Sequence, residues 1–224
     1  LTADGAYNPS ILTEGDPLYK GNAKTNETAR LNYLYQPDIF VGGLELNSIS
    51  ADFDGSGPDD TGFFGSDAKF PLVTFEENTL TLAEAYAKSG NSAGALAALN
   101  TFRAYMNSGG YISAGYQSTG QLYAPYLITD FLPVAGIANK GNLPADQALL
   151  KEILLERYVT FTGQLEQFTD LRRTKNFIGV TPKKGAKIPQ RFLYSQSEIN
   201  TNTSTPKLVA GDLFKETPIN SSAY

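Results

Sequence analysis

Residues 75–106, FEENTLTLAEAYAKSGNSAGALAALNTFRAYM, decide the fold. Apolar side chains recur every three or four residues on both sides of an interruption, Ser-Gly-Asn-Ser, at residues 89–92. This spacing is that of a helix with one buried face, and the interruption is typical of a tight turn. We therefore predict two helices joined as a hairpin, with small residues on their facing stripes that allow a close approach: Ala83, Ala87, Ala95 and Ala98.

The segments outside the hairpin extend the prediction to a mainly α chain with extensive irregular loops. Residues 123–138 favour a short helix, and a longer helix is expected to start near Pro144, where the missing N–H of proline costs nothing, and to be interrupted at Gly163. No alternating apolar pattern is strong enough for a large sheet. We read one domain, residues 1–224, in five segments: a loop-rich segment (1–70), the hairpin (71–106), a loop and short helix (107–142), helices (143–175) and an irregular C-terminal segment (176–224).

A single helical hairpin of the repeat type cannot bury both of its faces. The sequence therefore predicts either further hairpins beyond this chain or a substitute packing partner within it. No run approaches the roughly 20 apolar residues that a membrane-spanning helix needs.

Composition excludes several classes of function. The chain has no His and no Cys, which removes disulfides, thiol catalysis and the imidazole base of Ser-His-Asp hydrolases. A net charge of -5 and a pI near 4.8 argue against nucleic-acid binding, which needs clustered cations. The densest basic run is predicted to be a solvated loop: Lys183, Lys184 and Lys187.

A glycosidase remains possible in principle because it needs only two carboxylates facing a cleft. Glu152 and Glu156 are four residues apart and share one helical face. Arg157 and the Arg172–Arg173 pair are near enough in sequence to neutralise them. Since ion pairs on helices vastly outnumber catalytic dyads, we favour a structural role for both glutamates and predict that the protein is not an enzyme.

One stretch partly matches a calcium-binding loop. Oxygen-bearing side chains stand at positions one, three, five and nine, and glycine stands at position six. Position twelve is Phe63 instead of a bidentate glutamate, and no flanking helix is expected. A solvated turn is the favoured interpretation, and calcium is the one cofactor that the sequence leaves open, with these candidate ligands: Asp52, Asp54, Ser56 and Asp60.

Aromatic residues in predicted loops are the remaining candidates for binding. Aromatic planes stack on the apolar faces of sugar rings, whose hydroxyls bond to polar side chains, although the same rings suit other partners or a core. The loop aromatics are Tyr7, Tyr19, Phe63, Phe64, Tyr111 and Tyr116.

Three sets of segments, in the same order along the chain, resemble the signatures of the SusD/RagB family. The first covers the hairpin, with FPLVTFEEN at 70–78, LAEAY at 82–86, and residues 98–100 with Arg103. The others are ILLER at 153–157 with FTDLRR at 168–173, and SQSEI at 195–199 with Asn200 and Asn202. NETAR at 26–30 is also similar to a segment upstream of the family's hairpin. After the Glu-Arg motif the chain departs from the family, which puts a shared ion-pair network in doubt: Thr160, Gln164, Leu165 and Gln167.

The resemblance implies a tetratricopeptide-like α-α superhelix, of which this chain would be the C-terminal portion. It implies a protein of the outer membrane that faces the cell exterior and is held by a lipid anchor outside this chain. Such proteins capture oligosaccharides, or in some members peptides, and pass them to a SusC-like TonB-dependent transporter.

The resemblance also makes residues 1–70 the ligand-facing segment, because family members bind ligand mainly through loops outside the helical repeats. We expect stacking on the aromatic residues and polar contacts from the others in this set: Tyr33, Tyr35, Asn47, Asp59, Asp60, Phe63 and Phe64. Two alternatives remain: a transporter-docking scaffold or peptide-binding member whose ligand site lies elsewhere, and, remotely, a carboxylate-dyad glycosidase.

Overall fold

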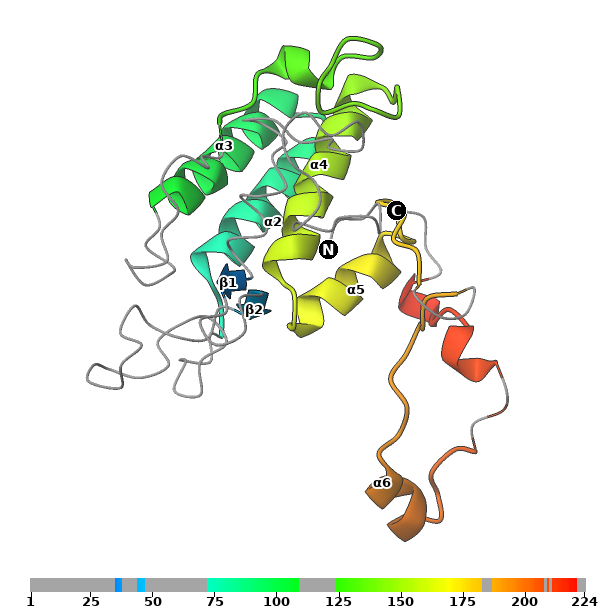
Figure 1. The fold of residues 1–224 in the computed structure, drawn as a ribbon. Helices are drawn as coiled ribbons and strands as arrows, with labels where there is room; N and C mark the ends of the chain where they lie inside the picture. The colour runs from blue at the N-terminus through cyan, green and yellow to red at the C-terminus, as the bar shows by residue number, and fades with distance from the viewer. Residues whose placement is uncertain are drawn as a thin grey trace, which may run out of the picture.

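The computed structural model describes residues 72–108, 124–182, 187–207, 209 and 211–220, together with the backbone of two short strands, 35–37 and 44–46. This part of the chain is mainly helical, as predicted (Figure 1). Its α-helices are α2 (Phe75–Lys88), α3 (Ser92–Ser108), α4 (Ala145–Thr160), α5 (Leu165–Arg173) and α6 (Gln196–Thr201). The shorter 3₁₀ helices are η2 (Ile128–Phe131), η3 (Asp212–Phe214) and η4 (Pro218–Asn220).

The predicted hairpin is confirmed as α2 and α3. The side chain of Thr74 caps α2 by accepting a hydrogen bond from the Glu77 N–H at 3.0 Å. The turn between the helices uses Gly90 with φ of 80°, a conformation that glycine adopts without strain. Of the four small residues predicted on the facing stripes, Ala83, Ala95 and Ala98 are buried in the core, and Ala87 is partly buried against it.

Helix α4 packs against one face of the α2–α3 hairpin and covers it. It starts directly after Pro144, which takes the N-cap position, and lies alongside α2 (Figure 1). Leu149 and Ile153 of α4 join Leu80, Leu99 and Phe102 of the hairpin in one core, all of them fully buried. The hairpin therefore has a substitute packing partner within this chain, and the finer prediction of a tetratricopeptide-like superhelix stays a prediction.

The short helix predicted within residues 123–138 is the single 3₁₀ turn η2. Tyr126 and Phe131 project from this region into the core, with their ring centroids 5.0 Å apart. The backbone does not continue as an α-helix because Leu132 is already extended and Pro133 has no N–H to donate.

The C-terminal part is irregular, as predicted, apart from α5 and short helical pieces. Gly163, with φ of 83°, reverses the chain between α4 and α5. Beyond α5, residues 187–192 return to this helix, and α6 is then held away from the helical body (Figure 1). None of the six residues of α6 is buried.

Two short strands, β1 (Tyr35–Pro37) and β2 (Leu44–Leu46), pair antiparallel, with Tyr35 opposite Leu46 and Pro37 opposite Leu44. They lie in the segment predicted to be loop-rich, and the described residues contain no large sheet, as predicted. Among the described residues, no helix is long and apolar enough to cross a membrane.

Candidate functional site

The predicted ligand residues lie almost entirely outside the described part of the chain. Only Tyr35 is placed, at the first position of β1, and there only its backbone is described. Within the described ranges, no group of three or more carboxylates is arranged to hold a metal ion. These candidate contacts and ligands lie outside those ranges: Tyr33, Asn47, Asp52, Asp54, Ser56, Asp59, Asp60, Phe63 and Phe64, together with Tyr7, Tyr19, Tyr111 and Tyr116. Lys183 and Lys184 of the basic run predicted as a solvated loop also lie outside them.

The densest polar constellation that is described joins α2, α4 and α5. We call it the ion-pair cluster, and it consists of Glu84, Arg157, Asp170 and Arg173. Arg157 donates to both carboxylate oxygens of Asp170, from Nε at 2.7 Å and from Nη2 at 3.2 Å. Arg173 donates from Nη1 and Nη2 to the two oxygens of Glu84 and from Nε to Asp170 at 2.8 Å.

Burial shields three of the four members of the ion-pair cluster from solvent. Glu84, Arg157 and Asp170 are each less than a tenth exposed. Burial alone would lower the pKa of Arg173, but its hydrogen bond to Glu84 and the charges of Asp170 and Glu84 outweigh this, so the pKa lies above its usual value. The charged atoms of all four side chains are engaged with one another across α2, α4 and α5. The cluster therefore suits positioning of the three helices.

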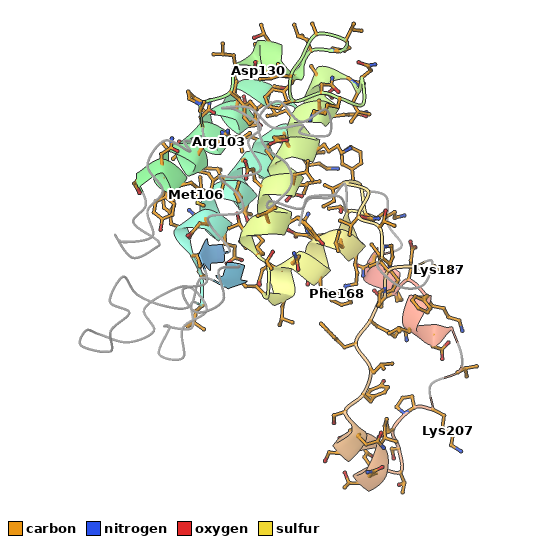
Figure 2. The ribbon with its side chains drawn as sticks, viewed as in Figure 1. Arg103, Met106, Asp130, Phe168, Lys187 and Lys207 are labelled. Carbon is orange, nitrogen blue, oxygen red and sulfur yellow. The ribbon has the colours of Figure 1, made fainter. Side chains whose placement is uncertain are left out.

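The two glutamates considered as a glycosidase dyad are also engaged inside the fold. Glu156 is paired with Arg103 of α3 at 2.7 Å, and both side chains are almost completely buried. Figure 2 labels Arg103 on this helix. Glu152 accepts a hydrogen bond from the Tyr126 hydroxyl at 2.8 Å, and the Arg103 guanidinium lies 4.2 Å from the centre of the Tyr126 ring. The structural role predicted for Glu156 is confirmed.

The partner expected for Glu156 was wrong. We expected Arg157 or the Arg172–Arg173 pair. The observed partner is Arg103, which is 53 residues from Glu156 in sequence. Arg157 instead faces α5, where Asp170 lies. Arg172 donates to the backbone oxygen of Gln190 at 3.0 Å and lies 4.4 Å from the centre of the Phe168 ring.

The structure also shows an exposed aromatic strip, Phe192, Leu193 and Tyr194, that we did not single out from the sequence. The Phe192 ring packs on the Phe168 ring of α5, with the ring centroids 4.6 Å apart. The Phe192 side chain nevertheless remains largely exposed. The backbone N–H of the neighbouring Gln190 donates to the backbone oxygen of Leu213 at 2.7 Å. This bond joins the two ends of the segment that carries α6. The sequence signal that could have revealed this strip is a group of three consecutive apolar residues followed by a polar run at 195–205.

In three comparisons, no protein-family model, no curated protein and no solved structure matches this chain.

Proposed function

We propose that the protein binds oligosaccharides without catalysis at the exterior face of the outer membrane, for uptake through a TonB-dependent transporter. The proposal rests on the resemblance of three ordered sets of segments to the SusD/RagB family. The lipid anchor and the superhelix belong to the same proposal.

The observation that carries the non-catalytic part is the engagement of the buried carboxylates. Glu156 is neutralised by Arg103, and Glu152 holds Tyr126, at less than a tenth exposure for each glutamate. A glycosidase instead needs two carboxyl groups that flank a substrate bond, with one of them able to lose and regain a proton. This arrangement argues against a catalytic dyad of Glu152 and Glu156.

The ligand contacts are proposed for the loop-rich residues 1–70, with stacking on Phe63, Phe64, Tyr33 or Tyr35. Calcium bound at residues 52–60 would stiffen this loop. Stacking with a few hydrogen bonds gives dissociation constants from about millimolar to micromolar, or about -4 to -8 kcal/mol.

Isothermal calorimetry against a panel of plant, host and microbial oligosaccharides, with and without calcium, tests this proposal. Binding that is lost in the Phe63→Ala/Phe64→Ala variant and retained in Phe214→Ala, an exposed aromatic control near the C-terminal end, supports it. Equal affinity of the folded double variant and the wild type would reject this site. Released reducing sugar that disappears in Glu152→Gln or Glu156→Gln would favour the glycosidase.

A second candidate function is docking on the transporter, with the ligand site elsewhere, and the C-terminal segment favours it. The aromatic strip is exposed and α6 has no buried residue, although an isolated helix of this length is unstable in water without a partner. Deletion of residues 1–70 separates the two functions. If the deleted protein still co-purifies with the transporter but no longer binds oligosaccharide, the loop-rich segment is the binding region.

A further inference from the structure

The C-terminal segment is bonded to α5 in a way that brings two arginine side chains to one place. Arg172 of α5 donates from Nη1 to the backbone oxygen of Gln190 at 3.0 Å. The next residue, Arg191, donates from Nη2 to the backbone oxygen of Lys215 at 3.5 Å. In Figure 1 the segment with η3 and η4, drawn in red, lies beside residues 187–192. Both guanidinium groups therefore belong to one junction between α5, residues 187–192 and the segment with η3 and η4.

This junction contains four buried donor groups that have no hydrogen-bond partner in the described part of the chain. They are Nε of Arg172, Nε of Arg191, the hydroxyl of Thr217 and the side-chain NH₂ of Asn220. We call these four residues the donor cluster. Thr217 lies two residues after Lys215, a span of at most about 7 Å, and its backbone oxygen accepts a bond from the Asn220 N–H at 2.9 Å. The donor cluster is therefore drawn from three segments that contact one another.

Unsatisfied donors in such a place are unfavourable for the fold. A buried N–H or O–H that leaves water without gaining an acceptor destabilises the folded state. Native structures keep few groups of this kind, and an ordered water or a bound ion commonly satisfies them. Asn220 is the most enclosed member, at 9% exposure, whereas the other three side chains are half-buried and remain within reach of solvent. Because all four groups can donate, the species that satisfies them must offer acceptors.

The donor cluster also carries two positive charges that the described residues do not neutralise. Within that part of the chain, neither Arg172 nor Arg191 forms an ion pair. The neighbouring carboxylate, Asp212, is bonded to Lys215 and accepts from the Val209 N–H at 2.9 Å. The hydrogen bond with Lys215 is the main cause that lowers the pKa of Asp212, and the charge of Arg191 is the smallest. Asp212 is thus already engaged and leaves the two guanidinium groups without a counter-charge.

Charge and donor number together select one kind of ligand. Water accepts hydrogen bonds but does not offset two guanidinium charges. A carboxylate has two oxygens and a single charge, so it would leave donors and one charge unmet. A phosphate or sulfate group has more acceptor oxygens and a charge of about -2, and arginine forms strong charge-assisted bonds with such groups.

We propose that the donor cluster is a binding site for a phosphate or sulfate group, held by Arg172, Arg191, Thr217 and Asn220. The bound group would join α5, residues 187–192 and η4, and so fix the base of the segment that carries α6. The inference does not depend on oligosaccharide binding, because the sugar contacts are proposed for residues 1–70, and it survives if that function fails.

Isothermal calorimetry of the full chain with inorganic phosphate and with sulfate tests the inference, at an ionic strength held constant with sodium chloride. We expect saturable binding at one site with a dissociation constant of about 1 mM or below. Arg191→Met should weaken it at least about tenfold, because a charge-assisted bond and one of the two counter-charges are lost. Lys207→Met, which removes an exposed cation elsewhere on the C-terminal segment, should bind as the wild type does.

A second variant, Asn220→Leu, keeps the result interpretable because it removes an unsatisfied donor and preserves side-chain size. Its thermal midpoint without added anion should be no lower than that of the wild type, whereas its affinity for either ion should fall about threefold or more. A site that merely holds the fold together would not separate these two readouts.

Glucose 6-phosphate in the same titration distinguishes the source of the group. Binding as tight as that of inorganic phosphate would assign the site to a group carried on a larger molecule, and binding of the inorganic ions alone would assign it to a free ion; both support the inference. It is overturned if neither ion gives saturable heat, since water then satisfies the donors, or if either folded variant retains wild-type affinity. Acetate that binds as tightly as sulfate would also overturn it.

Discussion

Replacement of Arg157 by methionine should destabilise the protein more than any other change in the ion-pair cluster. Arg157 holds both oxygens of Asp170, lies 3.5 Å from Glu84 and donates to the Thr81 hydroxyl at 2.9 Å. Methionine is similar in length, so the cavity is small and the main cost is electrostatic. The two buried carboxylates would then share the single guanidinium of Arg173.

Loss of one partner from a buried ion pair costs about 3–5 kcal/mol. Arg173 retains its own contacts to both acids, which places Arg157→Met near 3 kcal/mol. A domain of ordinary stability has about 5–15 kcal/mol in total, so the variant should still fold. With a urea m value of about 2 kcal/mol/M, the midpoint should fall by about 1.5 M.

The assay is urea unfolding followed by circular dichroism, with Lys207→Met as the control because Lys207 is exposed on the C-terminal segment. The control should change the free energy of unfolding by no more than about 0.5 kcal/mol. Arg157→Lys keeps the charge but loses the two-pronged geometry, so it should lie between wild type and Arg157→Met. If Arg157→Met costs less than about 1 kcal/mol at unchanged m value, the cluster does not hold the three helices together as argued.

Three further predictions concern the loop after η2 and the end of α4. Gly136→Ala should lower the free energy of unfolding by about 1–3 kcal/mol, since its Cβ would meet backbone atoms; an unchanged thermal midpoint would contradict the close crossing. Asn139→Ala removes bonds to Phe131 and Leu143 and should cost about 2–4 kcal/mol, with faster hydrogen exchange at the Leu143 amide; retained protection there would refute it. Burial raises the pKa of Tyr158 above its usual 10.0, so the folded state favours the protonated phenol. The resulting contribution to the free energy of unfolding is complete below pH 10 and is lost as pH rises through the folded pKa. Tyr158→Phe should therefore reduce the fall in stability above pH 10 in denaturant titrations, and an identical alkaline slope would argue against it.

The sequence predicted the elements whose signals are local. The hairpin followed from apolar spacing within single helices and from the Gly90 turn, and α4 followed from Pro144 and its own periodicity. These features need no knowledge of distant residues. The boundaries were correspondingly close, with α2 ending at Lys88 and α3 starting at Ser92.

The remaining features depend on contacts between residues far apart in sequence. Glu84 and Arg173 are separated by 89 positions, so nothing local indicated that they would meet. Residues 127–138 around η2 were anticipated only as a short helix, because their shape depends on Asn139, Asn142 and the close crossing at Gly136 and not on periodicity. The proposed ligand contacts in residues 33–64 rest on the resemblance and stay predictions.

The four members of the ion-pair cluster all come from the segments on which the proposed likeness to the SusD/RagB family rests: Glu84 from 82–86, Arg157 from 153–157, and Asp170 and Arg173 from 168–173. The departure at Gln167 does not open the cluster, since its side chain donates to the Tyr158 oxygen at 2.8 Å and so satisfies one of the last carbonyls of α4. These four positions thus fix how α2, α4 and α5 pack together, and three of the side chains, Glu84, Arg157 and Asp170, are buried. The proposed sugar contacts lie outside these four positions, in residues 33–64, so likeness at these motifs predicts an architecture more strongly than it predicts a ligand.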